Sequence, residues 1–134
     1  MSRVLAREYA MNCLYQLEMK QEFELGAVEY YLNSVCTEEK DLNYVKSVVE
    51  NFLEVRESVD LIISEHLKGW KIDRIAKVDL AVIRLAIVEI QTLEDIPVSV
   101  SINEAINLGK KFNDEESGQF INGVLGKIVI DLGV

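Results

Sequence analysis

Hydrophobic residues dominate the stretch from Val78 to Leu93, VDLAVIRLAIVEIQTL. Among its first thirteen residues, only Asp79, Arg84 and Glu89 are charged. A helix that is apolar on nearly every side is typical of a buried central helix rather than of a surface helix. The stretch is also too short and too charged to span a bilayer, which takes roughly 20 mostly apolar residues. We therefore expect one central helix here, around which the rest of the chain packs.

Apolar residues recur at three- and four-residue spacing through the rest of the chain, which is the helical pattern. The longest such stretch, residues 42–67, fits either one helix or two helices with a bend near residues 56–58. Val98, Val100 and Ile102 alternate as in a strand, but no second strand pattern lies nearby to pair with them. Beside the central helix, the pattern predicts helices at residues 3–19, 27–35, 42–67, 101–112 and 118–130, and a short helical turn at residues 71–77.

Polar residues at the start of these stretches are candidate N-caps, because their side chains can accept hydrogen bonds from the first free N–H groups. Asp41 and Asp79 are predicted to cap the long helix and the central helix. Ser101 and Glu104 form a capping box, S-x-x-E, and Ser117 is the predicted N-cap of the last helix. The resulting fold class is all-α, a single compact helical domain of six or seven helices around the buried central helix.

Composition narrows the class of protein. Hydrophobic residues make up 49 % of the chain and charged residues 28 %, with a single Pro, which excludes a disordered chain. The first residues carry charges at helical spacing, no apolar signal segment follows, and no transmembrane segment is predicted, so we expect a cytoplasmic protein. Cys13 and Cys36 form no CxxC motif and His66 is the only histidine, so no metal site is expected. Both cysteines are expected to be reduced and to lie on apolar helix faces.

The net charge of −9 argues, by itself, against binding to nucleic acid. The charge is unevenly distributed, however. Residues 21–66 carry eleven acidic and three basic side chains, whereas residues 68–77 carry four basic side chains and one acidic one. A local basic patch on an acidic protein is therefore compatible with the sequence.

Catalytic and nucleotide-binding motifs are missing from the sequence: it has no P-loop, GxGxxG, GxSxG, HExxH or EF-hand loop. Glu89 and Glu104 would suit a general acid and base. A charge inside an apolar helix needs a counter-charge, though, and either glutamate can supply one for Arg84. We therefore expect a structural ion pair of Arg84 with Glu89 or Glu104, no enzymatic activity and no cofactor.

Basic and aromatic residues form the candidate binding surface. Lys68, Lys71, Arg74 and Lys77 recur every three residues around Trp70. Lysines at this spacing are often only a solvated face, but cations that bind phosphates beside a ring that stacks on a base are also the composition used for single-stranded RNA. If the first helix packs nearby, it adds Arg3, Arg7 and Tyr15.

Four segments carry a family pattern: AREYA with LYQ at residues 6–16, VDLAVIRLAIVEI at 78–90, IPVSVSINEAINLGKKF at 96–112, and SGQFINGVLGKI at 117–128. The elements INEA and F-x-NGVL, in this order and at this separation, are specific. On these segments the chain resembles the NusB family of bacterial transcription antitermination factors. Residues 19–67 match it only by their helical pattern.

The resemblance implies one domain, residues 1–134, made of two helical subdomains. It implies binding to the boxA element of nascent RNA jointly with NusE, a small-subunit ribosomal protein that doubles as a transcription factor. It further implies assembly on RNA polymerase with other Nus factors and suppression of termination, notably on ribosomal RNA operons, without catalysis. Matched position by position, the resemblance adds two kinds of RNA-binding residue. One is the acidic residue at the start of the core helix, and the others lie where the last loop meets the last helix. Together with the patch, the expected RNA-binding residues are Arg3, Arg7, Tyr15, Lys71, Arg74, Lys77, Asp79, Glu116, Ser117 and Phe120.

Two departures from the family pattern stand out. Val4 and Leu5 occupy positions where further bases are common, and Gly126 replaces the usual Asp of NGVLDK. Fewer phosphate contacts mean weaker binding and a shallower dependence on salt. We therefore expect this chain to bind RNA poorly without NusE.

Two other interpretations remain. The chain is alternatively a protein-binding helical adaptor or a homodimer without direct RNA binding, with Val4, Met11 and Tyr15 as the interface ridge. A NusB-like domain also begins some ribosomal RNA methyltransferases. This chain ends at Val134 with nothing to hold a methyl donor, so we do not expect that activity.

Overall fold

The computed structural model describes residues 3–69 and 71–134. Over these residues the chain forms six α-helices and two short 3₁₀ helices, without a strand, which confirms the all-α prediction. The residues that alternate near Val98 lie in a helix. The elements in order are α1 (Arg3–Lys20), η1 (Leu25–Ala27), α2 (Glu29–Val35), α3 (Glu39–Glu65), η2 (Ile72–Arg74), α4 (Lys77–Thr92), α5 (Val98–Phe112) and α6 (Glu115–Leu132).

Helix α4 is the central helix that the sequence predicts. Every residue from Asp79 to Glu89 is buried, the charged ones included. The helix contacts α1, α3, α5 and α6, so neighbours cover it on all sides. A helix that is apolar on nearly every side is therefore explained by burial on every face rather than by a membrane. Across the described residues, no helix is both long enough and apolar enough to cross a bilayer.

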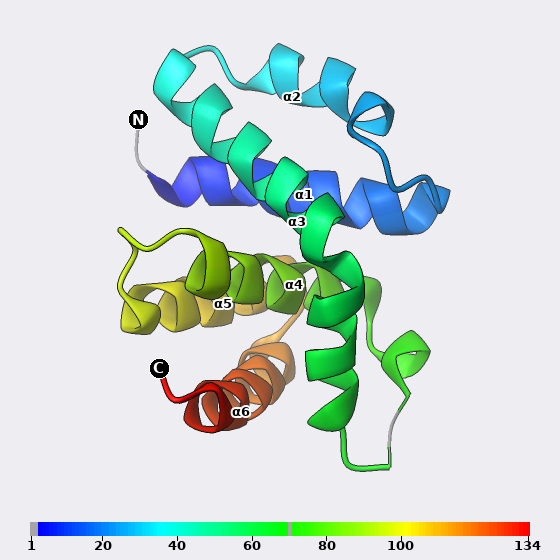
Figure 1. The fold of residues 1–134 in the computed structure, drawn as a ribbon, viewed down its shortest axis with the longest axis vertical. Helices are drawn as coiled ribbons and strands as arrows, with labels where there is room; N and C mark the ends of the chain where they lie inside the picture. The colour runs from blue at the N-terminus through cyan, green and yellow to red at the C-terminus, as the bar shows by residue number, and fades with distance from the viewer. Residues whose placement is uncertain (1–2, 70) are drawn as a thin grey trace.

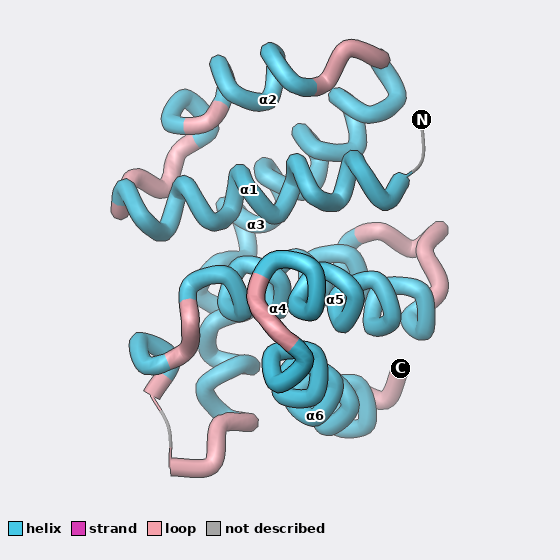
Figure 2. Tube along the Cα trace, turned by 180° about the vertical axis from the view of Figure 1, so that it is seen from behind, coloured by secondary structure: helices cyan, strands magenta, loops and turns pink. Residues whose placement is uncertain are grey.

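The helices form two groups that share α3. Figure 1 shows α1, α2 and the first half of α3 above α4, α5 and α6, while the second half of α3 continues down beside the lower group. Figure 2 shows from behind that α1 lies directly over the pair formed by α4 and α5. The long periodic stretch is thus one helix rather than two, and it packs against both groups.

The four predicted N-caps are wrong by three or four residues. Asp41, Asp79, Ser101 and Ser117 all lie inside their helices, and all four side chains are buried. The true N-cap of α6 is Asp114, whose Oδ1 accepts a hydrogen bond from the Ser117 N–H at 2.8 Å. Ser101 and Ser117 instead donate their hydroxyls to carboxylates on α4. These two serines hold helices together and do not cap them. The sequence pattern of a helix cap is the same in both cases, so it cannot tell the two roles apart.

Both cysteines are free and buried, as expected, but the expected place on a helix face is right for Cys13 and wrong for Cys36. Cys13 is on the inner face of α1, and Cys36 directly follows α2. Burial raises the pKa of the Cys13 thiol to about 12. The thiol is therefore protonated at neutral pH and behaves as a small apolar side chain in the core.

Candidate nucleic-acid interface

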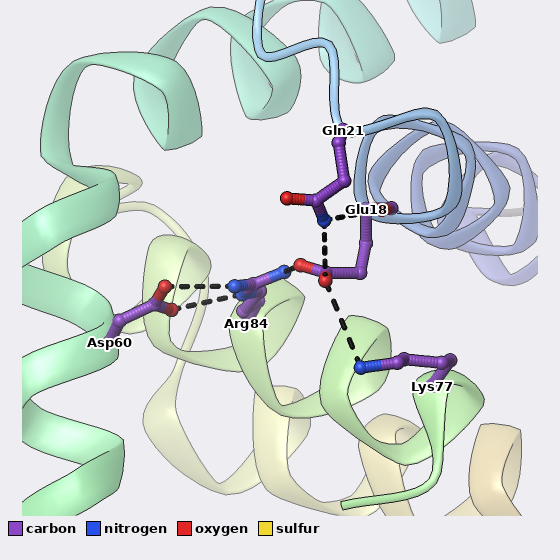
Figure 3. Close-up of polar contacts among 5 residues, drawn as sticks. All are labelled: Glu18, Gln21, Asp60, Lys77 and Arg84. Atoms are coloured by element: carbon purple, nitrogen blue, oxygen red, sulfur yellow. Dashed lines mark hydrogen bonds and ion pairs between the residues drawn. The ribbon is translucent and has the colours of Figure 1, made fainter. Parts of the chain in front are cut away.

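Arg84 is buried and paired, but not with the predicted partners. Its Nε and Nη2 donate to the two carboxylate oxygens of Asp60 at 2.9 and 2.8 Å, and its Nη1 donates to Glu18 Oε1 at 2.6 Å. Figure 3 shows Arg84 between these two acids. The other oxygen of the Glu18 carboxylate, Oε2, accepts a hydrogen bond from Gln21 and forms an ion pair with Lys77. The network ties α1, α3 and α4 together at one point.

Helical geometry explains why the predicted pair of Arg84 with Glu89 or Glu104 is wrong. Glu89 follows Arg84 by five residues, so the two side chains lie about 140° apart around α4. Arg84 therefore points toward α3 and the end of α1, whereas Glu89 faces the start of α1 and helix α5. Glu104 is half-buried on α5, and its charge helps to raise the pKa of Arg7 rather than that of Arg84.

Glu89 has a cluster of its own, and this cluster takes Arg7 out of the predicted RNA surface. Arg7 Nε donates to Glu89 Oε2 at 2.8 Å and its Nη2 to Oε1 at 3.3 Å. The Tyr44 hydroxyl also donates to Oε2, and the Ser101 hydroxyl donates to Oε1 at 2.8 Å. Because Arg7 is only 5 % exposed, it is a core ion-pair residue and cannot contact RNA.

Five of the predicted RNA-binding residues line one cavity of about 360 Å³, which we name the Asp79 pocket. It lies where η2, the start of α4 and the start of α6 meet. Asp79 is 6 % exposed, and its carboxylate accepts hydrogen bonds from Ser117 Oγ at 3.2 Å and from Asn113 Nδ2 at 3.4 Å. The pocket is lined by Arg74, Ile75, Ala76, Asp79, Asn113, Asp114, Glu116, Ser117 and Phe120.

Two glycines, one on α5 and one on α6, allow these helices to pack closely beside the Asp79 pocket. A Cβ at Gly109 would lie 2.5 Å from Ile121 Cδ1, and a Cβ at Gly118 would lie 2.8 Å from Lys110 Cγ. At Gly109 the neighbour is the fully buried Ile121, so a larger residue there would push the helices apart. At Gly118 the neighbour is the exposed, flexible Lys110 side chain, which can move aside. The short loop between α5 and α6 then carries Asn113 and Asp114 over the start of α4.

Tyr15 lies on α1 between two contacts that border the same region. One turn after it, Glu18 is 3.8 Å from Lys77 Nζ at the start of α4. Seven residues before it, Glu8 accepts from Lys111 Nζ at 2.5 Å at the end of α5. A seven-residue step turns a helix by about 20° from the starting face, so Tyr15 and Glu8 share one face of α1. Tyr15 therefore lies half-buried between the end of α5 and the start of α4.

Other predicted residues lie away from the pocket. Arg3 is at the opposite end of α1, roughly 18 Å along the helix from Tyr15, with its guanidinium 4.3 Å from the centre of the Tyr44 ring. Lys71 is exposed just before η2, and Trp70 lies outside the described residues. The basic side chains at three-residue spacing do not share one helix, because Lys71 precedes η2, Arg74 ends η2 and Lys77 begins α4.

The ridge proposed as a dimer interface is not continuous. Val4 is 46 % exposed, but Met11 is only 3 % exposed and belongs to the core. An apolar side chain in the core cannot contribute to a contact between molecules. A protein-binding adaptor or a homodimer that used this ridge would therefore have no contact residue at Met11, the middle of the three positions.

Sequence reasoning missed several residues of the region. Asn113 and Asp114 line the Asp79 pocket, and Lys110 and Lys111 are exposed at the end of α5. The two lysines could have been found from the sequence, because they are adjacent bases at the end of a predicted helix, just before the last loop. Asn113 could not, since its role depends on a hydrogen bond to a carboxylate 34 residues earlier in the chain.

Comparison with known proteins agrees with this architecture. The model of the NusB family matches residues 4–129. The transcription antitermination protein NusB of Acetivibrio thermocellus is 44 % identical over 96 % of this chain and 89 % of its own length. Its counterpart in Bacillus subtilis is 43 % identical over 98 % of both chains.

Solved structures give the same result. NusB from T. maritima superposes with a TM-score of 0.87 at 31 % identity, covering 96 % of this chain and 90 % of the other. A crystal structure of antitermination factors NusB and NusE in complex with dsRNA contains a chain with a TM-score of 0.81 at 30 % identity, covering 96 % and 97 %. By family model, by identity over nearly its whole length and by fold, this chain belongs to the NusB family.

Proposed function

We propose that this chain is a transcription antitermination factor that binds boxA RNA together with NusE. In this function it joins the RNA polymerase elongation complex with other Nus factors and suppresses termination, notably in ribosomal RNA operons. It acts in the cytoplasm as a binding protein and not as an enzyme. The observation that carries the proposal is the match to the NusB family over residues 4–129, with a related fold seen in a complex of NusB, NusE and dsRNA.

The geometry supports three roles for the residues of the RNA surface: phosphate contacts, base stacking and contacts with base edges. Arg74 is the one cation in the lining of the pocket, while Lys77 begins α4 and Lys71 is exposed just before η2, and cations at such positions bind phosphates without reading sequence. Tyr15 and Phe120 are half-buried rings on α1 and α6 that suit stacking on unpaired bases. Asp79, Glu116 and Ser117 offer polar groups for base edges. Arg3 remains a candidate for a phosphate farther along the strand.

A low affinity without NusE follows from the charge of this surface. Arg7 is engaged with Glu89, Lys77 is close to Glu18, and Lys111 is bonded to Glu8. The RNA surface therefore lacks the charge of Arg7, which lies in the core, and the charges of Lys77 and Lys111 are partly neutralised within the protein. Each lost phosphate contact lowers affinity and flattens the salt dependence, so the partner must supply further contacts.

Fluorescence anisotropy with a boxA-containing RNA, with and without NusE, at two salt concentrations tests the proposal. We expect weak binding by the chain alone and clearly tighter binding with NusE. Arg74→Ala should weaken binding and reduce the salt slope by about one charge, whereas Lys127→Ala, an exposed cation on α6 outside the Asp79 pocket, should do neither. Tight, salt-resistant binding by the chain alone would refute the dependence on NusE.

Two further results would bear on the proposal as a whole. Absence of any RNA-dependent signal in every arm would refute the RNA-binding function. Light scattering at two protein concentrations, with and without RNA, distinguishes that outcome from self-association, because a homodimer doubles the mass in the absence of RNA.

A further inference from the structure

A second hollow, which we name the α6 groove, shares Phe120 with the Asp79 pocket. It consists of two cavities, of about 260 and 340 Å³, which adjoin because both are lined by residues 66–68 and Lys127. Residues 65–68, at the end of α3 and just after it, form one wall, and a face of α6 within residues 119–131 forms the other. Figure 1 shows α6 beside the lower half of α3. The groove thus borders the RNA surface but lies outside the Asp79 pocket.

The α6 wall of this groove is a single stripe along the helix. Phe120, Gly123, Val124, Lys127 and Ile130 stand at positions i, i+3, i+4, i+7 and i+10, which places them on one helix face. From first to last the stripe rises by roughly 15 Å, or about three turns. Val124 is buried at its base, whereas Ile130 is 76 % exposed at one end. A mostly apolar face of this length is typical of a contact between two amphipathic helices.

Gly123 is the residue of this stripe that no contact within the chain explains. Glycine inside a helix is less stable than alanine, because it loses more backbone freedom on folding. At Gly109 the close packing of Ile121 accounts for the missing side chain, but a Cβ at Gly123 would meet no atom of the described residues within 4 Å. The backbone of α6 is therefore open at this point, and a second helix can approach it closely from outside.

Two lysines give one end of the groove a positive charge, although the chain carries a net charge of −9. The 260 Å³ cavity is lined by Lys68 and Lys127 and by no carboxylate among the described residues. Both lysines are exposed, and no described residue forms an ion pair with either of them. Glu65 and Asp131 line only the other cavity, where Asp131 Oδ2 already binds His66 Nε2 at 2.5 Å. Two free cations therefore flank the apolar stripe.

These features favour a protein rather than RNA as the occupant. Most of the exposed lining is apolar, and apolar side chains gain free energy from burial there, whereas a ribose–phosphate strand gains little. Acidic side chains match the two lysines. We propose that the α6 groove binds an acidic amphipathic helix of a partner protein, with apolar side chains packed over Gly123 and carboxylates facing Lys68 and Lys127. This binding does not depend on the RNA-binding function proposed above, although Phe120 places the helix next to the bound strand.

The first test uses two synthetic peptides and the folded, ¹⁵N-labelled protein. Each peptide is a helix of about four turns with leucine at i, i+3, i+4 and i+7, and its exposed positions are glutamate in one peptide and lysine in the other. An NMR titration follows the backbone amide signals of Gly123 and Lys127. We expect the acidic peptide to shift both signals saturably and to bind the groove roughly tenfold more tightly than the lysine peptide. The net charge of the chain alone predicts the opposite preference, so the comparison is diagnostic.

The second test changes the groove. Lys127→Glu should weaken binding of the acidic peptide roughly tenfold, whereas Lys40→Glu, the same change at an exposed position at the start of α3, should not. Gly123→Leu should abolish the shift of the Lys127 signal, because its side chain fills the space above the helix backbone. Asn122→Leu adds the same side chain at an exposed neighbouring position outside the groove and should leave binding unchanged. Circular dichroism checks that each variant is folded.

Several results would overturn the proposal. Equal affinity of the two peptides for the groove, or full binding by folded Lys127→Glu, would show that charge does not select the occupant. Full binding by folded Gly123→Leu would show that nothing approaches α6 at that point. Displacement of the acidic peptide by a boxA-containing RNA would assign the groove to RNA. Shifts of the same two signals on raising the protein concentration alone would assign it to a second copy of the chain.

Discussion

Two arginines inside the core are each matched by carboxylates with nearly ideal geometry. Arg84 makes a bidentate contact with Asp60 and a third bond to Glu18, while Arg7 contacts both oxygens of Glu89. Burial would lower the pKa of Arg84, but the hydrogen bonds and charges of these acids raise it, so the charge persists. A buried ion pair costs desolvation, and its importance appears mainly when one partner is removed.

Replacing Arg84 should therefore destabilise the fold strongly. Arg84→Ala leaves Asp60 and Glu18 without their main partner, and we expect a loss of about 3 kcal/mol in the free energy of unfolding. Urea unfolding followed by circular dichroism measures it. Arg74→Ala, an exposed arginine, is the control and should change stability by less than about 0.5 kcal/mol. An unchanged midpoint for Arg84→Ala would show that the network contributes nothing.

Glu18 makes the stability of the protein depend on pH in the acid range. Burial would raise the pKa of this carboxyl, but the hydrogen bond and charge of Arg84 lower it below its ordinary value of 4.5. A lowered pKa contributes stability above the unfolded value, and that stability is lost as pH falls through the folded value. Glu18→Gln should thus be less stable than wild type at pH 7, and the difference should shrink below pH 4.5.

Unfolding free energies measured from neutral to acid pH test this expectation. Glu54→Gln, an exposed glutamate on α3, serves as the control, because a surface change of this kind alters stability little. A difference between wild type and Glu18→Gln that stays constant across the acid range would contradict the role of Arg84 in holding this carboxylate ionised.

At the scale of elements, the contact between α5 and α6 depends on the absence of a side chain. A methyl group at Gly109 would lie 2.5 Å from Ile121 Cδ1, and Ile121 is fully buried, so it has little room to move. We expect Gly109→Ala to destabilise the fold by about 1–3 kcal/mol through overpacking. Because the contact positions the loop of the Asp79 pocket, RNA affinity should fall as well.

Gly126→Ala is the matched control for this prediction. Gly126 is also inside a helix, but a Cβ there meets nothing within 4 Å. The same substitution should stabilise the protein by about 0.5–1 kcal/mol, because alanine favours the helix over glycine. Thermal unfolding of both variants measures the contrast. Equal effects of the same sign would show that the close approach at Gly109 is not under strain.

The elements themselves were largely predictable, and their starts were not. Helical periodicity depends on which side chains face the core, and it located all six helices. Helix starts depend on what a polar side chain contacts. Ser101 matched a capping box, yet its hydroxyl bonds Glu89 on another helix. A local pattern carries no information about such a partner.

At the scale of the whole molecule, the sequence indicated a central helix and the resemblance indicated the region of the site. Asp79, Ser117 and Phe120 do converge, as the motif positions implied. Arg7 was misassigned because its charge alone does not reveal that Glu89 lies beside it, 82 residues later in the chain. Pairings of this kind depend on the packing of α1 against α4, which becomes visible only when the helices are assembled.

Helix α3 has a consequence for recognition. It packs against α1 and α2 along its first half and against α4 and α6 farther on, so the two groups of helices share one continuous rod. Tyr15 comes from one group and the Asp79 pocket from the other. Because the rod fixes their spacing before any RNA arrives, the strand meets a preorganised surface, and less conformational entropy is lost when it docks.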